Sequence, residues 1–143
     1  MVRIDQDEVQ NLQKFVNMLN EESNNGAVVV VEGKRDVSAL LSVGFNGNVV
    51  TLNNFKGVNG LVDNLDKVSK VILMLDMDPK GKYLTHKILK LLQCKGKNVD
   101  MFYKRKLAEI TKGKVRQIEE IMIYKKYISD VSQIYKGRFA SWI

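Results

Sequence analysis

The chain has 143 residues, 45% of them hydrophobic and 27% charged, which is the size and composition of one folded domain that needs no disulfide or structural metal. It has a formal net charge of +7, no apolar stretch long enough to cross a bilayer and no apolar segment of a signal peptide, so we expect a cytoplasmic protein without a membrane span. Its one cysteine, Cys94, and one histidine, His86, exclude an internal disulfide and argue against a cysteine–histidine zinc site and a histidine-based triad.

The first predicted element is an amphipathic helix over residues 5–22, in which Asp5 and Glu8 resemble a capping box. Residues 27–31 are a run of Ala and Val without polar alternation, which predicts a strand that is covered on both faces. A helix over residues 34–43 and a strand over residues 48–52 follow.

The alternation of helix and strand continues through the second half of the chain. We predict a short helix at residues 58–65, a fully apolar strand at 71–75, a strong helix at 83–94 and a fourth strand at 98–102. In the helix at 83–94 we expect Cys94 to be a small buried residue. Residues 107–110 and 118–128 have the spacing of further helices.

Strands that alternate with helices predict an α/β fold with a parallel sheet of about four strands, flanked by helices and joined by right-handed crossovers. We expect a single domain over residues 1–143, with a core at about 26–103 and the N-terminal helix at 5–22. A basic helical C-terminal extension would occupy residues 104–143. Because there is one proline and no obvious linker, we expect this extension to pack on the core.

The charge is divided unevenly between the two halves of the chain. Residues 1–79 carry 7 Lys and Arg against 11 Asp and Glu, a net charge of −4, whereas residues 80–143 carry 16 against 5, a net charge of +11. A basic half is expected of a protein that binds a polyanion, and lysine-rich surfaces also occur merely as solvated faces. Charge alone does not decide between these interpretations.

Two acidic motifs follow the two apolar strands. Glu32-Gly-Lys-Arg-Asp36 comes after the first, and Asp76-Met-Asp-Pro-Lys-Gly81 begins 44 positions after Glu32, after the other. In doubly wound sheets, ligands bind beyond the carboxyl ends of the strands, where the order of connection reverses. If these two strands are neighbours, Glu32, Asp76 and Asp78 converge at that edge. A lone Asp-x-Asp is also common in plain turns, so the prediction depends on both motifs together.

Three converging carboxylates repel one another, and a hard cation that prefers oxygen ligands holds them together at neutral pH. Mg²⁺ fits best, because it needs few protein ligands and uses water and substrate phosphates for the rest; Mn²⁺ is a possible substitute. We expect Asp76 and Asp78 to be metal ligands. Glu32 either completes the metal shell or acts as general acid or base, and the sequence does not choose between these roles.

Other residues of the two motifs are expected to support this centre. Asp36 could hold it from the following helix, Gly33 belongs to the first motif, and Gly81 would let the backbone pass close to metal and substrate. Cations beside the carboxylates suit a phosphate that bridges them, although ordinary surface ion pairing is an equally good explanation for any single one. The candidate phosphate-binding residues are Lys34, Arg35, Lys80 and Lys82.

The two motifs resemble those of the Toprim domain, which is shared by topoisomerases, bacterial-type primases, recombination proteins of the RecR kind, OLD-family nucleases and a ribonuclease that matures small ribosomal RNA. The resemblance covers about residues 26–103, and the short length and lysine-rich tail look most like the small stand-alone Toprim proteins of archaea. It implies a four-stranded parallel sheet, a glutamate in acid/base or metal duty at Glu32, and two aspartates on Mg²⁺ at Asp76 and Asp78.

The chain departs from the larger members of that family, because it has no room for the separate tyrosine domain and gate of a topoisomerase or for the zinc module of a primase. We therefore expect a Mg²⁺-dependent nuclease or nucleotidyl-transfer-type enzyme that acts on RNA or DNA. The alternative is a non-catalytic nucleic-acid-binding subunit of a larger protein complex. A phospho-acceptor receiver domain is less well supported, because receivers need an acidic pair after the first strand.

Overall fold

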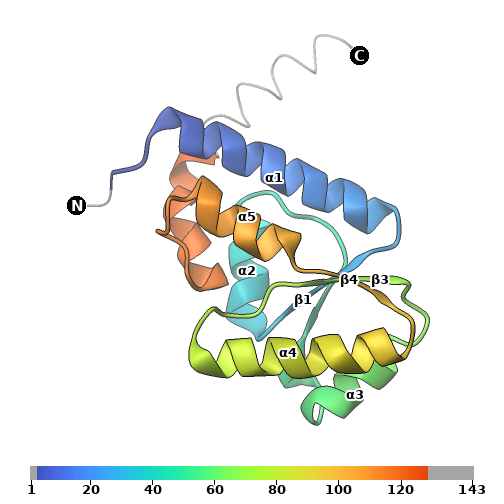
Figure 1. The fold of residues 1–143 in the computed structure, drawn as a ribbon. Coiled ribbons are helices and arrows are strands. Elements are labelled where there is room, and N and C mark those ends of the chain that lie inside the picture. Colours follow the sequence, from blue (N-terminus) through green and yellow to red (C-terminus); the bar gives the residue numbers. More distant parts are fainter. Residues whose placement is uncertain (1–2, 129–143) are drawn as a thin grey trace.

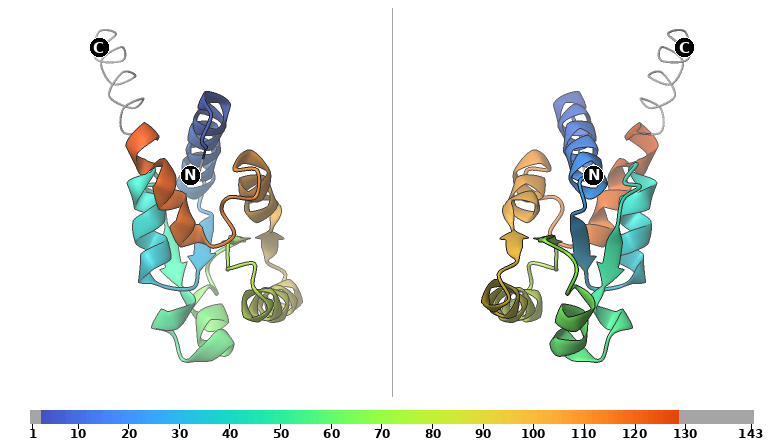
Figure 2. Two further views of the ribbon diagram at one scale, coloured as in Figure 1. Left: turned by 90° about the vertical axis from the view of Figure 1, so that its left-hand side faces the viewer. Right: turned by 90° about the vertical axis from the view of Figure 1, so that its right-hand side faces the viewer.

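The computed structural model describes residues 3–128 of the chain. A sheet lies between layers of helices (Figures 1 and 2). Its strands are β1 (Val28–Val31), β2 (Val49–Thr51), β3 (Lys70–Leu73) and β4 (Asn98–Asp100). They are all parallel and are arranged in the order β2-β1-β3-β4. The predicted α/β fold with a four-stranded parallel sheet is confirmed.

The helices connect the strands and cover both faces of the sheet. The helix α1 (Gln6–Asn24) precedes β1, and α2 (Lys34–Ser42) joins β1 to β2. The 3-10 helix η1 (Leu52–Asn54) and α3 (Gly57–Asn64) lead to β3, and α4 (Pro79–Cys94) leads to β4. The helix α5 (Phe102–Ile110) and the 3-10 helix η2 (Ile118–Tyr124) follow β4. Within residues 3–128, no helix is long and apolar enough to cross a membrane.

The two faces of the sheet belong to two hydrophobic clusters, because successive side chains of a strand point to opposite faces. Val29, Val31, Ile72 and Met74 pack with side chains from α1, α2, α5 and η2. Val30, Val71, Leu73 and Leu75 pack with side chains from α3 and α4. Burial on both faces explains why the sequences of β1 and β3 contain no polar alternation.

The connections reverse direction at β1, and this reversal positions the site. From β1 the chain passes to β2 on one side of it and then to β3 on the other side, so β1 and β3 are neighbours. Val30 is aligned with Leu73, and the backbone N–H of Met74 donates to the carbonyl of Val30 over 2.9 Å. The carboxyl ends of the two strands therefore open at the same edge, where ligands bind in doubly wound folds.

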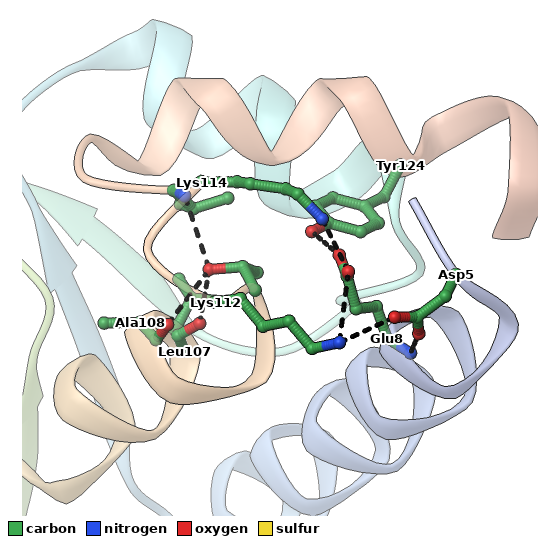
Figure 3. A network of polar contacts seen from close by, with 9 residues as sticks. Asp5, Glu8, Leu107, Ala108, Lys112, Lys114 and Tyr124 are labelled. Carbon is green, nitrogen blue, oxygen red and sulfur yellow. Dashed lines mark hydrogen bonds and ion pairs between the residues drawn. The ribbon is translucent and has the colours of Figure 1, made fainter. Parts of the chain in front are cut away.

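The segment after α5 is tied to α1 by a buried carboxylate (Figure 3). Glu8 is only 2% exposed, and its two oxygens accept hydrogen bonds from Tyr124 Oη over 2.7 Å and from Lys114 Nζ over 2.5 Å. At the surface beside them, Lys112 Nζ lies 2.7 Å from an Asp5 carboxylate oxygen. Within the described residues, η2 packs against α2 and shares a hydrophobic cluster with α1.

Several details differ from the sequence predictions. The fourth helix begins at Pro79 and not at residue 83, and α5 begins at Phe102, immediately after β4 ends at Asp100. The predicted helix at 118–128 is a 3-10 helix as far as Tyr124, and the part of the predicted extension beyond residue 128 lies outside the described residues. The prediction that Cys94 is buried is wrong: it is exposed, because it is the last residue of α4 and lies off its buried face.

Candidate functional site

The two acidic motifs meet at the carboxyl edge of the sheet, because they follow neighbouring parallel strands. Glu32 follows β1 directly, and Asp76 comes three residues after the end of β3. Both side chains are partly buried. The convergence that depended on neighbouring strands is therefore present for Glu32 and Asp76.

Glu32 and Asp76 each keep one oxygen away from water without a hydrogen bond. Glu32 Oε1 and Asp76 Oδ1 are buried and have no hydrogen-bond partner among the described residues. Burial, followed by the negative charges of Asp76 and Asp78, raises the pKa of Glu32 to about 6, although the positive charge of Lys80 opposes these effects. An unpaired buried carboxylate oxygen is costly, so this pair lacks the hydrogen bonds that would offset its burial.

Asp78 has a structural role, the capping of α4, that was not predicted from the sequence. It is the N-cap of α4, and its Oδ1 accepts a hydrogen bond from the backbone N–H of Gly81 over 2.6 Å. Pro79 then occupies the first turn, where its missing N–H costs nothing. Asp78 is exposed and close enough to Glu32 to affect its pKa, but one of its oxygens is used by the helix.

Gly81 is required by a close approach between two backbone segments. A Cβ atom at this position would lie 1.9 Å from the carbonyl oxygen of Asp76, a separation that no side chain can adopt. The Gly81 carbonyl accepts from Thr85 Oγ1 over 2.7 Å, which fixes the first turn of α4. Gly81 thus brings the start of α4 against the Asp76 backbone.

Asp36 stabilises the backbone of the first motif through a hydrogen bond. Its side chain is buried in the first turn of α2, and Oδ2 accepts from the backbone N–H of Gly33 over 3.1 Å. Burial raises the pKa of Asp36 and the charges of Asp76 and Glu119 act in the same direction, whereas the Gly33 N–H opposes them. The carbonyl of Glu32 accepts from the backbone N–H of Asn53 over 2.9 Å, which anchors the corner after β1 to η1.

The donor set at this edge suits a hard cation that also binds water and phosphate. Within residues 3–128, no group of three or more His, Cys, Asp or Glu side chains is arranged to hold a metal ion by itself. Glu32 Oε1 and Asp76 Oδ1 nevertheless offer two unpaired carboxylate oxygens, and Mg²⁺ commonly takes one or two carboxylates and completes its shell with water and substrate oxygens. The chemistry of these two residues would therefore fit Mg²⁺, if water and substrate oxygens supplied further ligands.

The four predicted phosphate-binding residues, Lys34, Arg35, Lys80 and Lys82, are all exposed and flank this edge from the first turns of α2 and α4. A fifth cation at this edge, Lys104, was not predicted from the sequence. It is half-buried on α5, and its Nζ lies 3.4 Å from the carbonyl oxygen of Asp76. Burial lowers the pKa of Lys104, and the charges of Asp76, Asp78 and Glu32 oppose that effect. The strand order could have indicated this position, because β4 is the neighbour of β3 and Lys104 lies on α5, which directly follows β4.

The comparisons with known proteins cover the segment that contains both motifs. The family described as Toprim domain matches residues 26–103. A UPF0292 protein of Archaeoglobus fulgidus is 36% identical over 116 residues, which cover 81% of this chain and 90% of that protein. The DNA primase DnaG of Staphylothermus marinus is 32% identical over 94 residues, which cover 63% of this chain and 21% of the primase.

A solved structure also resembles the chain over most of its length. It is described as a putative protein from Aquifex aeolicus and matches with a TM-score of 0.66 and 35% sequence identity. The match covers 78% of this chain and 98% of the other chain. The similarity therefore extends beyond the sheet to the helices that surround it.

Proposed function

This chain belongs to the Toprim domain family, which has metal-dependent roles connected with nucleic acids, and on that premise we propose that it catalyses Mg²⁺-dependent chemistry on nucleic-acid phosphodiesters. The reaction is hydrolysis or nucleotidyl transfer on RNA or DNA, with Glu32, Asp76 and Asp78 as the catalytic and metal-binding residues. Mn²⁺ can replace Mg²⁺, because it takes the same oxygen ligands.

The observation that carries this proposal is the pair of unpaired buried oxygens, Glu32 Oε1 and Asp76 Oδ1. A protein that used these carboxylates only for stability would pair them with donors, as most buried polar groups are paired. Here the unpaired oxygens lie at the topological switch point of the sheet. A divalent cation removes the cost of leaving them unpaired, so the site favours binding of such a cation.

The chain's own residues divide the remaining tasks. Asp76 holds the metal, Glu32 is a second ligand or moves a proton at its carboxylate, and a pKa near 6 suits proton transfer close to neutral pH. Asp78 uses the oxygen that is not bonded to Gly81. When bound, Mg²⁺ supplies charge neutralisation at the phosphate and a water of lowered pKa. The phosphate backbone is bound by Lys34, Arg35, Lys80, Lys82 and Lys104.

Asp76→Asn tests this proposal directly. The variant keeps the size of the side chain and removes its charge, so it should lower Mg²⁺-dependent cleavage of a mixed RNA and DNA panel by about two orders of magnitude. Asp66→Asn is the matched control, because Asp66 is exposed and precedes β3 at the opposite edge of the sheet. A wild-type protein that leaves every substrate intact, or equal activity in both variants, would contradict catalysis.

Two observations favour a second function. Because no three metal-ligating side chains are grouped within the described residues and Asp78 caps a helix, the site could serve binding without cutting. The chain would then be a nucleic-acid-binding subunit of a larger protein complex. Binding by wild-type protein that weakens steeply with salt and is unchanged by Glu32→Gln, together with absence of cleavage, would favour this function. A stable protein partner recovered with the chain would support it further.

A further inference from the structure

A pocket of about 280 Å³ lies beside the acidic centre, and neither the family nor the proposed chemistry assigns it a ligand. One face of α4 lines it with residues at helical spacing, and α5 lines it with two cations. Met77 and Met101, which follow β3 and β4, complete the wall. The full lining is Met77, Lys82, Thr85, His86, Leu89, Met101, Lys104 and Arg105.

The pocket is continuous with the acidic centre through two residues. Met77 stands between Asp76 and Asp78 in the sequence, and Lys104 both lines the pocket and lies 3.4 Å from the Asp76 carbonyl. A ligand in the pocket would therefore be the immediate neighbour of a phosphate bound at Asp76.

The chemistry of the lining limits the ligand. Met77, Leu89 and Met101 provide an apolar wall, and thioether groups pack well against aromatic rings. Lys82, Lys104 and Arg105 place three cations around it, and none of the lining residues is acidic. A free inorganic anion would not use the apolar wall, and a purely apolar ligand would not use the cations.

Size limits the ligand further. Pockets that enclose drug-sized molecules have about 300–1,000 Å³, so a pocket of about 280 Å³ has room for a single aromatic ring system. A flat ring would pack against the apolar wall, and a negative charge attached to it would lie near the three cations. A ligand of this kind also fits the volume of the pocket. Arg105 can lie over such a ring as well as contact a phosphate, because the guanidinium group is planar.

We propose that this pocket binds the base of one unstacked nucleotide, whose neighbouring phosphate lies at the acidic centre, so that the substrate is a single-stranded or locally opened segment of nucleic acid. This inference rests on the proposed function for the identity of the neighbouring phosphate. Contact through the base face is tolerant of sequence, so the pocket selects single strands and not a particular base.

The test compares two single-stranded oligonucleotides of equal length and charge, one with bases and one abasic at every position, bound to the full chain in EDTA. Wild-type protein should bind the oligonucleotide with bases about tenfold more tightly. The Leu89→Asp variant should bind the oligonucleotide with bases and the abasic oligonucleotide with equal affinity. Leu91→Asp is the matched control, because Leu91 is also a partly buried residue of α4 but does not line the pocket, and it should keep the tenfold preference.

A second pair of variants covers the case in which Leu89→Asp does not fold. Arg105→Glu should weaken binding of the oligonucleotide with bases more than Lys106→Glu does, because Lys106 is the exposed neighbour on α5 and lies outside the pocket. Equal binding of the two oligonucleotides by wild-type protein, or equal effects of both charge reversals, would overturn the proposal. Displacement of the oligonucleotide by an equal nucleotide concentration of UMP would assign the pocket to a free nucleotide and overturn the single-strand assignment.

Because these measurements are made without Mg²⁺, their failure is separate from a failure of the proposed catalysis. Base preference without cleavage would remove the catalytic function and leave the pocket in place. Cleavage that depends on Asp76 but shows no base preference would remove the pocket and leave the catalytic function.

Discussion

Glu8 and Glu32 differ in how their carboxylate oxygens are hydrogen-bonded. Glu8 is almost fully buried, and both of its oxygens are bonded, to Lys114 and to Tyr124 (Figure 3). Glu32 is less buried, yet one of its oxygens and one of Asp76 have no hydrogen-bond partner among the described residues. A buried carboxylate with hydrogen-bond partners stabilises the fold. A carboxylate oxygen without a partner at the open edge of the sheet stabilises the fold only when a ligand binds to it.

The largest expected effect is at Glu8. Glu8→Ala leaves the Lys114 ammonium group near a buried tyrosine without a counter-charge, and loss of one partner of a buried ion pair typically costs about 3–5 kcal/mol. Urea denaturation should record this loss, in a single transition if the chain is one domain, as we propose. Asp7→Ala, a change at the exposed neighbour, is the control. Equal destabilisation by the two variants would mean that the Glu8 network contributes little.

The second effect separates the two regions by their response to Mg²⁺. Binding of a cation at Glu32 and Asp76 should stabilise the folded chain by about 2.7 kcal/mol at a concentration 100 times its Kd. Thermal unfolding with and without Mg²⁺ measures this shift. The shift should vanish in Asp76→Asn and persist in Asp66→Asn, and a shift that survives in both would locate the cation elsewhere.

The third effect concerns the backbone that supports the open site. Gly81→Ala should destabilise the chain by about 1–3 kcal/mol, the usual cost of overpacking, because its Cβ meets the Asp76 carbonyl. Gly60→Ala is a matched change inside α3, where the nearest atom to the new Cβ lies at an ordinary 3.5 Å. Chemical denaturation should therefore give opposite signs for the two variants, since alanine is the better helix former. Similar values would indicate that α4 can shift away from Asp76.

The smallest effect is the pH dependence of the metal-free protein. The pKa of Glu32 is raised from 4.5 to about 6, so its stabilising contribution is fully present below pH 4.5 and is lost as pH rises through about 6. Water screens this partly exposed group, so the loss is about 1 kcal/mol. Glu32→Gln should therefore gain stability relative to wild type between pH 4.5 and pH 7. An unchanged difference across that range would contradict the raised pKa.

The sequence was sufficient to predict the parallel sheet and the carboxyl edge at which the two motifs meet. It was not sufficient to predict contacts between segments that are distant in the chain. The apolar runs in β1 and β3, and the acidic residues that follow them, predicted the fold and the meeting of Glu32 with Asp76. The hydrogen bond between Tyr124 and Glu8 spans 116 positions, and no local periodicity encodes it.

Local patterns also left some roles undecided. An aspartate before proline can cap a helix or bind a metal, so the capping by Asp78 could not be read from its spacing. Lys104 was missed because it lies after the fourth strand, and only the strand order brings it to Asp76. The exposure of Cys94 depends on the face of α4 on which the last turn ends, which the general tendency of cysteine to be buried does not determine.

The most direct measurement of the central claim is a crystal structure of the chain soaked with Mn²⁺, with the ion located by its anomalous scattering. We predict one ion at Glu32 Oε1 and Asp76 Oδ1, beside the oxygen of Asp78 that is not bonded to Gly81. An ion bound only elsewhere, or no ion at this edge in crystals that retain Mn²⁺, would contradict it.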